Sequence, residues 1–450
     1  MRAELLRWCE QIRVPRYTSY PTAPHFHPGI CEADYRRWLA ELAPGLGLSV
    51  YLHVPFCREL CWYCGCHTAI THRPERVAAY VELLLAEIRR VLEQLPEGME
   101  LLHLHWGGGT PSIIGADALA RVTALLRERL RFAPEAECAI ELDPRRVDER
   151  LVEALARIGI NRASLGVQTL DPEVQRAIGR IQPWEVVEAC ARRLRAAGIH
   201  RLAVDLLYGL PRQSCSSVVA TARQVLELRP DRVAVFAYAH LPHIKRHQRL
   251  IDPAAIPKAR ERAEQFEALC QLFTEAGYVP VGLDHFARPE DAMARALREG
   301  RLRRNFQGYT TDPAEVLLGF GASAIGSLPQ GYVQNHPDLR AYRRVVLEGG
   351  LPVARGYALG PEDRAIREVI ERVMCYGRVD LAEVARRHGL DVARLEPDGE
   401  RFGQLLALGV ASREGSTVAL SPGHRPLVRL LAAAFDRFLE PEPARHALAL

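Results

Sequence analysis

The stretch that decides the fold, residues 51–66, reads YLHVPFCRELCWYCGC. A short apolar run ends at Phe56, and Cys57, Cys61, Cys64 and Cys66 follow within ten residues. Four thiols this close together in a reduced chain usually hold metal. Structural zinc usually takes two separated pairs of ligands, whereas three thiolates at C-x3-C-x2-C spacing on one tight loop suit three irons of a [4Fe–4S] cluster. The spacing therefore favours an iron–sulfur cluster on Cys57, Cys61 and Cys64 over structural zinc or unligated thiols.

The overall composition is that of an ordinary globular protein. The chain has 450 residues, 48% hydrophobic and 25% charged, which allows two or three domains. Its formal net charge of +4 is too small to indicate a nucleic-acid partner. We expect no transmembrane helix, because no apolar run reaches about 18 residues, and no signal peptide, because the first residues lack an apolar core. Eleven cysteines, with four on one loop, favour a reducing cytoplasm.

Short apolar runs alternate with amphipathic stretches from about residue 48 onward. The runs that we interpret as strands are residues 49–54, 101–106, 139–142, 163–167, 202–207 and 233–238. The stretches at 77–95, 119–130 and 187–197 carry apolar residues at helical spacing. This alternation predicts right-handed βαβ units and a parallel sheet. Six units in a row favour a barrel or partial barrel with its chemistry at the carboxyl ends of the strands, and a doubly wound sheet is the alternative.

The chain divides into three regions. Residues 1–45 are rich in aromatic residues, Pro and His and predict an arm that packs on another surface, followed by a main domain over 46–347. A Gly/Pro-containing linker at 348–361 marks a boundary, so we expect 348–450 to be a linker and a mainly helical cap domain. Its expected elements are helices at 362–373, 381–388 and 403–408, a strand at 418–420 and a last helix at 426–439. Their order resembles a winged helix, but no dense Lys/Arg stripe indicates DNA reading.

Several further motifs, in order along the chain, carry a family resemblance. The cysteine loop is similar to that of radical S-adenosylmethionine (SAM) enzymes, and the fuller sequence resembles one family among them, the oxygen-independent coproporphyrinogen III oxidases (coproporphyrinogen dehydrogenases). The matching segments are PRYTSYPTA (15–23), LHWGGGTP (104–111), IELDPR (140–145), LGVQ (165–168), DLLYGLP (205–211), FAYAHLP (236–242), DHFARP (284–289) and NFQGYTT (305–311). The resemblance implies an α/β fold: a partial (β/α) barrel of TIM type, with the N-terminal arm over the active site and a mainly helical C-terminal domain.

The same resemblance implies a reaction and its cofactors. Two propionates of coproporphyrinogen III would become vinyl groups without oxygen, giving protoporphyrinogen IX. SAM, bound at the open fourth iron of the cluster, would supply a 5′-deoxyadenosyl radical, which abstracts hydrogen from an unactivated carbon, and the protein would position the reactants. A second SAM is implied because two propionates each lose one hydrogen. The expected electron donor is flavodoxin or ferredoxin, and we expect a cytoplasmic monomer.

The resemblance also assigns roles to individual residues. Contacts to SAM are implied for Tyr51, Tyr63, Gly108, Gly109, Thr110, Glu141, Gln168, Arg180, Asp205, Ala239 and Ile325. Glycines at 107–109 would let the backbone approach the ligand closely, whereas Asp143 is expected to cap the following helix. Candidate catalytic residues are Cys66, Tyr51 and His53. Cys66 could instead be a buried thiol or an alternative cluster ligand. His53 could instead be a hydrogen-bonded histidine of the core.

A substrate with four carboxylates needs cations, and guanidinium groups bind carboxylates well. Arg16, in the arm motif, is the first candidate, and Arg288, Arg303 and Arg304 are weaker ones. The alternative function is that of the related haem chaperone, a haem-binding protein that typically carries a His-Asn-x-x-Tyr-Trp sequence. Residues 305–310 here read NFQGYT, without His or Trp, which favours the enzyme. A SAM enzyme acting on another substrate is a third hypothesis.

Overall fold

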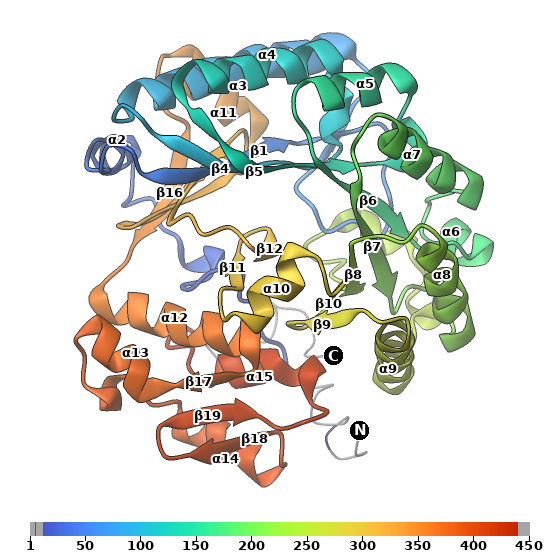
Figure 1. Cartoon of the computed structure of the whole chain (residues 1–450), viewed down its shortest axis with the longest axis vertical. Helices are drawn as coiled ribbons and strands as arrows, with labels where there is room; N and C mark the ends of the chain where they lie inside the picture. The colour runs from blue at the N-terminus through green and yellow to red at the C-terminus, as the bar shows by residue number, and fades with distance from the viewer. Residues whose placement is uncertain (1–4, 6–11, 440–450) are drawn as a thin grey trace.

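One mixed sheet of twelve strands organises the molecule (Figure 1). This computed structural model describes residue 5 and residues 12–439. Six strands follow one another in chain order and are parallel: β1 (Gly47–Val54), β4 (Glu100–Gly108), β5 (Arg131–Leu142), β6 (Arg162–Gln168), β7 (Arg201–Tyr208) and β8 (Arg232–Ala237). The first five strands each cover one of the six predicted runs, and β8 covers the sixth except for residue 238. The order of the described strands runs from β16 to β9 without closing, so the prediction of an α/β partial barrel is confirmed.

Helices follow the parallel strands and lie along the outer side of the curved sheet (Figure 1). They are α3 (Pro74–Gln94), α4 (Ala116–Arg129), α5 (Glu149–Arg157), α6 (Pro172–Ala177), α7 (Trp184–Ala196), α8 (Cys215–Glu227) and α9 (Ala259–Glu275). Helices α3, α4 and α7 each begin three residues before the predicted start, because the first turn of each precedes the apolar residues at helical spacing from which the start was predicted. The side chains between sheet and helices form the main hydrophobic core.

Shorter strands extend both edges of the parallel sheet. Strand β13 (Val316–Phe320) is parallel to β1, and β14 (Ile325–Leu328), β15 (Gly331–Asn335) and β16 (Val353–Ala358) continue antiparallel beyond it. Strands β10 (His285–Ala287) and β9 (Val279–Val281) extend the other edge, and α10 (Ala292–Arg298) and the hairpin β11 (Arg303–Asn305)–β12 (Gly308–Thr310) follow. The linker expected at 348–361 is therefore wrong for residues 353–358, which pair with β15 in the main sheet.

The C-terminal domain lies below the sheet in Figure 1. It contains α12 (Pro361–Tyr376), β17 (Arg378–Asp380), α13 (Leu381–His388), α14 (Gly399–Ala407), β18 (Ala411–Glu414), β19 (Thr417–Leu420) and α15 (Val428–Ala433). Its three strands form a small antiparallel sheet, so the order of elements matches the expected winged-helix order. The last helix is shorter than predicted, because the Ala434 carbonyl accepts a hydrogen bond from Asp398 and the chain leaves the helix at that point.

The N-terminal region joins both parts of the molecule. Tyr17 donates a hydrogen bond to Asp436 at 3.0 Å, and Val14, Tyr17 and Tyr20 belong to the core of the C-terminal domain. Helix α2 (Glu32–Ala40) instead buries Trp38 and other residues in the main core. The domain boundaries at residues 45 and 347 stay predictions. Residues 1–4 and 6–11 of the arm lie outside the described residues.

Candidate active site

The cysteine loop is closed at its base by a pair of short strands. Strand β2 (Phe56–Cys57) pairs in parallel with β3 (Ala69–Ile70). The backbone N–H of Ala69 donates to the Pro55 carbonyl at 2.6 Å, and that of Thr71 donates to the Cys57 carbonyl at 3.0 Å. The residues between them therefore form one closed loop that starts directly after β1, at the carboxyl edge of the parallel sheet.

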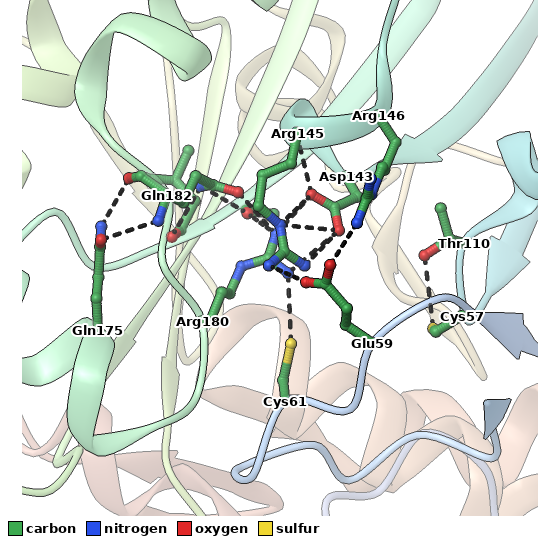
Figure 2. Close-up of polar contacts among 12 residues, drawn as sticks. Cys57, Glu59, Cys61, Thr110, Asp143, Arg145, Arg146, Gln175, Arg180 and Gln182 are labelled. Carbon is green, nitrogen blue, oxygen red and sulfur yellow. Dashed lines mark hydrogen bonds and ion pairs between the residues drawn. The ribbon is translucent and has the colours of Figure 1, made fainter. Parts of the chain in front are cut away.

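Two of the three candidate cluster ligands receive a hydrogen bond from another element. Thr110 Oγ1 donates to Cys57 Sγ and Arg180 donates to Cys61 Sγ, each at 3.5 Å (Figure 2). Burial raises the pKa of the Cys57 thiol to about 11, and the Thr110 hydrogen bond opposes this rise. Donors directed at sulfur stabilise a thiolate, which is the form that binds metal.

The third thiol, Cys64, lies near two basic side chains of the segment that follows β8. A hydrogen bond from Cys66 lowers the pKa of Cys64 to about 6; burial opposes this shift, and the charges of His247 and Lys245 assist it. Those two side chains also hold the loop backbone. His247 Nε2 donates to the Cys64 carbonyl at 2.7 Å, and Lys245 Nζ donates to the Cys66 carbonyl at 2.9 Å.

This donor set suits a [4Fe–4S] cluster. Cys57, Cys61 and Cys64 offer three soft sulfur ligands from one rigid loop, and each receives a hydrogen bond that favours the thiolate. Within residues 12–439, no three His, Cys, Asp or Glu side chains converge closely enough to hold a single metal ion. In a cubane cluster, however, each thiolate binds a different iron.

The glycine segment after β4 packs against the start of the cysteine loop. Gly108 has φ +117°, and a Cβ there would lie 2.8 Å from the His53 ring and from the Val54 carbonyl oxygen. A Cβ on Gly109 would lie 2.6 Å from the Phe56 carbonyl oxygen and 3.0 Å from Cys57 Sγ. Close contacts within the protein therefore already require glycine at both positions. Approach of a ligand to their backbone stays a prediction.

A hydrogen-bonded network of polar side chains lies behind this segment. His53 Nε2 contacts the His67 carbonyl oxygen at 3.1 Å, so Nε2 carries the proton and Nδ1 accepts from the Tyr51 hydroxyl at 3.0 Å. Burial lowers the pKa of His53 to about 4 and keeps it neutral. Glu141 contacts His105 Nε2 at 3.0 Å and accepts a hydrogen bond from the Gly108 backbone at 3.3 Å. His53 is thus a hydrogen-bonded residue that fixes the far end of the cysteine loop.

Arg180 is the centre of a buried polar cluster beside Cys61 (Figure 2). It donates to the Gly166 carbonyl at 2.7 Å and to Gln182 at 2.9 Å, and it pairs with Asp143 at 3.3 Å. Burial would lower its pKa, but Tyr63, Asp143 and Cys61 raise it above the usual range. Asp143 also accepts from the Arg145 backbone, which confirms the predicted cap.

A cavity of about 1100 Å³, the reaction cavity, lies in front of these groups. Its lining includes most of the predicted site residues: Arg16, Cys57, Cys61, Tyr63, Cys64, Cys66, Gly108, Gly109, Thr110, Glu141, Gln168, Arg180, Asp205 and Ala239. Tyr51 and His53 support the glycine segment from behind. Ile325 does not lie with this group, because it packs in a separate cluster with Phe26 and Tyr332.

Two cavity residues have unusual local properties. Gln168 ends β6 with φ +69°, a left-handed conformation that is strained for a residue with a side chain. Burial, with the Glu141 charge second, raises the pKa of Asp205 to about 7, and the hydrogen bond from Ser164 opposes the rise. Gln168 lies at the end of β6 and Asp205 lies on β7, and both line the reaction cavity.

The sequence reasoning missed the residues that hold the cysteine loop in place. Besides Lys245 and His247, Gln248 donates to the Tyr63 carbonyl at 3.0 Å. Glu59 on the loop pairs with Arg145 at 2.9 Å and also with Arg146 (Figure 2). The sequence feature that could have pointed to these residues is the run HLPHIKRHQRL at 240–250, which has many basic residues and no acidic one.

Comparisons with known proteins agree with this geometry. A family model described as the Radical SAM superfamily matches residues 51–225. The oxygen-independent coproporphyrinogen III oxidase of Bradyrhizobium diazoefficiens is 49% identical over 450 residues, which are 100% of both chains. The protein of the same name from Escherichia coli K12 is 38% identical and covers 94% of this chain and 93% of its own. The solved structure of coproporphyrinogen III oxidase from Escherichia coli superposes with a TM-score of 0.89, at 36% identity, over 95% of this chain and 100% of that one.

The three-cysteine loop at the carboxyl edge of a partial barrel defines this chain as a radical SAM enzyme, whose cofactors are SAM and a [4Fe–4S] cluster. Within that class, the chain belongs to the family of oxygen-independent coproporphyrinogen III oxidases. The family resemblance in the sequence is confirmed, and the relatives do not support the chaperone alternative. The roles assigned to single residues stay predictions.

Proposed function

We propose that this chain converts coproporphyrinogen III to protoporphyrinogen IX by oxygen-independent oxidative decarboxylation of two propionates. The observation that carries the proposal is the cysteine loop, which faces a cavity of about 1100 Å³ together with the glycine segment and Glu141. Each propionate loses CO2, one hydrogen atom and one electron, and a vinyl group forms. An external one-electron acceptor takes the electron.

When bound, SAM and the cluster supply a radical that abstracts hydrogen from an unactivated carbon. Cys57, Cys61 and Cys64 would hold the cluster, and Thr110 and Arg180 orient two of these thiols through hydrogen bonds. Glu141, already oriented by His105, is placed to accept hydrogen bonds from ribose hydroxyls.

A second SAM binds, in this proposal, on the side of the cavity formed by β6, β7 and β8. Gln168, Asp205 and Ala239 line that side of the cavity. The reaction cavity is somewhat larger than the ~300–1,000 Å³ of sites that hold one drug-sized ligand. Two ligands side by side, or one ligand and part of the substrate, fit such a volume. Equilibrium dialysis of SAM against the cluster-loaded protein measures this stoichiometry.

The substrate enters beside the N-terminal arm. Arg16 lines the cavity, is exposed at its rim, and donates to the Ala237 carbonyl at 3.3 Å. Its guanidinium has further donors for a propionate. Arg303 and Arg288 are less suitable, because they pair with Glu371 at 2.9 Å and with Glu290 at 2.5 Å.

We further propose that flavodoxin or ferredoxin delivers electrons at segment 243–250, the donor face. Ile244 and Leu250 are 52% and 58% exposed there, and Lys245, Arg246 and Arg249 surround them. The segment contacts the cysteine loop directly through Lys245. A basic, partly apolar surface next to a redox centre suits a small acidic electron carrier. No helix in the described part of the chain could cross a membrane; a cytoplasmic monomer stays our prediction.

Anaerobic incubation with coproporphyrinogen III, SAM, dithionite and a one-electron acceptor tests the proposal. We expect protoporphyrinogen IX and about two CO2 per molecule, as the reaction requires. The Cys61→Ser variant, which removes a cluster ligand, should form neither product. Tight stoichiometric haem binding without decarboxylation would instead favour the chaperone.

A further inference from the structure

A second cavity of about 400 Å³, which we call the arginine pocket, adjoins the reaction cavity. Arg16 and residues 236–239 at the end of β8 line both cavities. The start of α9 and the C-terminal domain, at Pro426 and Arg429, form other walls of the arginine pocket. No residue of the cysteine loop or of the glycine segment contributes to its lining among the described residues. A group of a ligand that binds in the arginine pocket therefore does not contact the cysteine loop or the glycine segment.

The lining of the arginine pocket is strongly cationic. Its cationic side chains are those of Arg13, Arg16, Lys258, Arg262, Arg304 and Arg429. Asp284 is the one carboxylate among the described lining residues, and it pairs with His285 at 2.7 Å. Burial opposes ionisation of Asp284, but His285, followed by Arg304 and Arg16, lowers its pKa to about 2. Among the described residues, Arg16, Lys258, Arg262 and Arg304 form no ion pair with a carboxylate, so their charge is available to an anionic ligand.

Arg262 is the clearest sign that a counter-charge belongs here. Its guanidinium donates to the Tyr238 carbonyl at 2.9 Å, but its buried Nε has no hydrogen-bond partner among the described residues. Burial lowers the pKa of Arg262, and Arg16 adds a second positive charge to the lining of the same pocket. Buried cations close to one another are costly unless an anion joins them. Lys258 and Ala259 add the N-terminal end of α9, which also favours negative charge.

We propose that the arginine pocket binds carboxylates of the substrate, namely the propionates that are not decarboxylated, with Arg262 as a direct contact. This inference rests on the proposed function. The substrate carries two such groups, and Arg16 lies where the two cavities meet. Anchoring the unreactive end supplies binding energy that positions the reactive propionates near the cysteine loop. The carboxylate of SAM has the same chemistry and is distinguished by the test.

The test compares three variants of helix α9, one of them a control, in the cluster-loaded, full-length protein. Arg262→Gln removes the charge, and Arg262→Lys keeps it. Arg260→Gln is the matched control, because Arg260 lies two residues earlier, is 81% exposed and pairs with Glu264 at 2.9 Å. The probes are coproporphyrin III, a fluorescent tetracarboxylate; mesoporphyrin IX, which keeps only the two unreactive propionates; and SAM, measured by calorimetry.

We expect Arg262→Gln to weaken binding of both porphyrins by about ten- to a hundredfold, the usual effect of losing a hydrogen bond to a charged group. Arg262→Lys should recover part of this affinity, and Arg260→Gln should bind like the wild type. SAM affinity should stay unchanged in all three variants, which also reports correct folding.

Three outcomes overturn the inference. If only coproporphyrin III loses affinity, the pocket holds the reactive propionates; if only SAM does, it holds the SAM carboxylate. If neither porphyrin is affected, the pocket does not bind substrate, although the proposed function stands. A wild-type protein that neither binds coproporphyrin III nor converts coproporphyrinogen III would refute the proposed function itself.

Discussion

Replacing Glu87 with Gln should flatten the pH dependence of stability. Glu87, on α3, is 1% exposed and accepts hydrogen bonds from the Tyr342 hydroxyl at 2.5 Å, Asn335 at 2.6 Å and the Gly321 backbone at 2.9 Å. Burial raises its pKa from 4.5 to about 7, and the three hydrogen bonds oppose the rise. Its carboxyl group therefore binds a proton more tightly in the folded state than in the unfolded state.

The sign and size of the effect follow from this difference. Stability falls as pH rises from about 4.5 to about 7, because the unfolded state releases the Glu87 proton in this range while the folded state still holds it. At about 1.4 kcal/mol per pH unit, the full loss is about 3 kcal/mol, of which roughly 2–3 kcal/mol falls between pH 5 and pH 8. The Gln variant lacks this titration.

Urea unfolding followed by tryptophan fluorescence at pH 5, 6, 7 and 8 measures the difference. The free energy of unfolding of Glu87→Gln, minus that of the wild type, should increase by about 2–3 kcal/mol over this range. The comparison cancels the other titrating groups, which both proteins share. A difference that stays constant with pH would show that Glu87 is ionised throughout and that the reasoning is wrong.

Two further predictions concern the cysteine loop and the donor face beside it. Gly109→Ala should lower the iron content, because its Cβ would lie 3.0 Å from Cys57 Sγ. Gly65→Ala is the control, because a Cβ at Gly65 meets open space, and it should bind the normal amount of iron. Equal iron in the two variants would exclude this packing constraint. Charge reversal of the donor face, Arg246→Glu with Arg249→Glu, should slow flavodoxin-driven turnover by about tenfold at low salt and leave dithionite-driven turnover unchanged. An equal loss of turnover with both reductants would show that the substitutions damage the active site rather than docking of the electron carrier.

The sequence was most informative where the signal is local. The cysteine spacing, the glycine segment and the six apolar runs each lie within a few residues, so the positions of β1 and β4–β8 could be predicted. Strand β16 could not, because residues 353–358 are recognised as a strand only through pairing with β15. The same residues, next to Gly and Pro, were interpreted as a linker.

Contacts between distant segments account for the missing part of the site. His247 lies 183 residues from Cys64, and no local pattern connects them. Ile325 was assigned through the resemblance alone, and the structure places it with Phe26 instead. The glycines at 108 and 109 were assigned to SAM binding, which stays a prediction, and contacts with His53 and Phe56 explain the need for glycine without a ligand.

The central claim is that hydrogen abstraction from a propionate, in the cavity beside the cysteine loop, leads to decarboxylation. Coproporphyrinogen III with deuterium on the propionate carbon next to the ring tests it most directly, by mass spectrometry of the 5′-deoxyadenosine formed during turnover. We predict deuterium in the 5′-deoxyadenosine and one labelled molecule for each vinyl group formed. Vinyl formation with unlabelled 5′-deoxyadenosine would contradict the account.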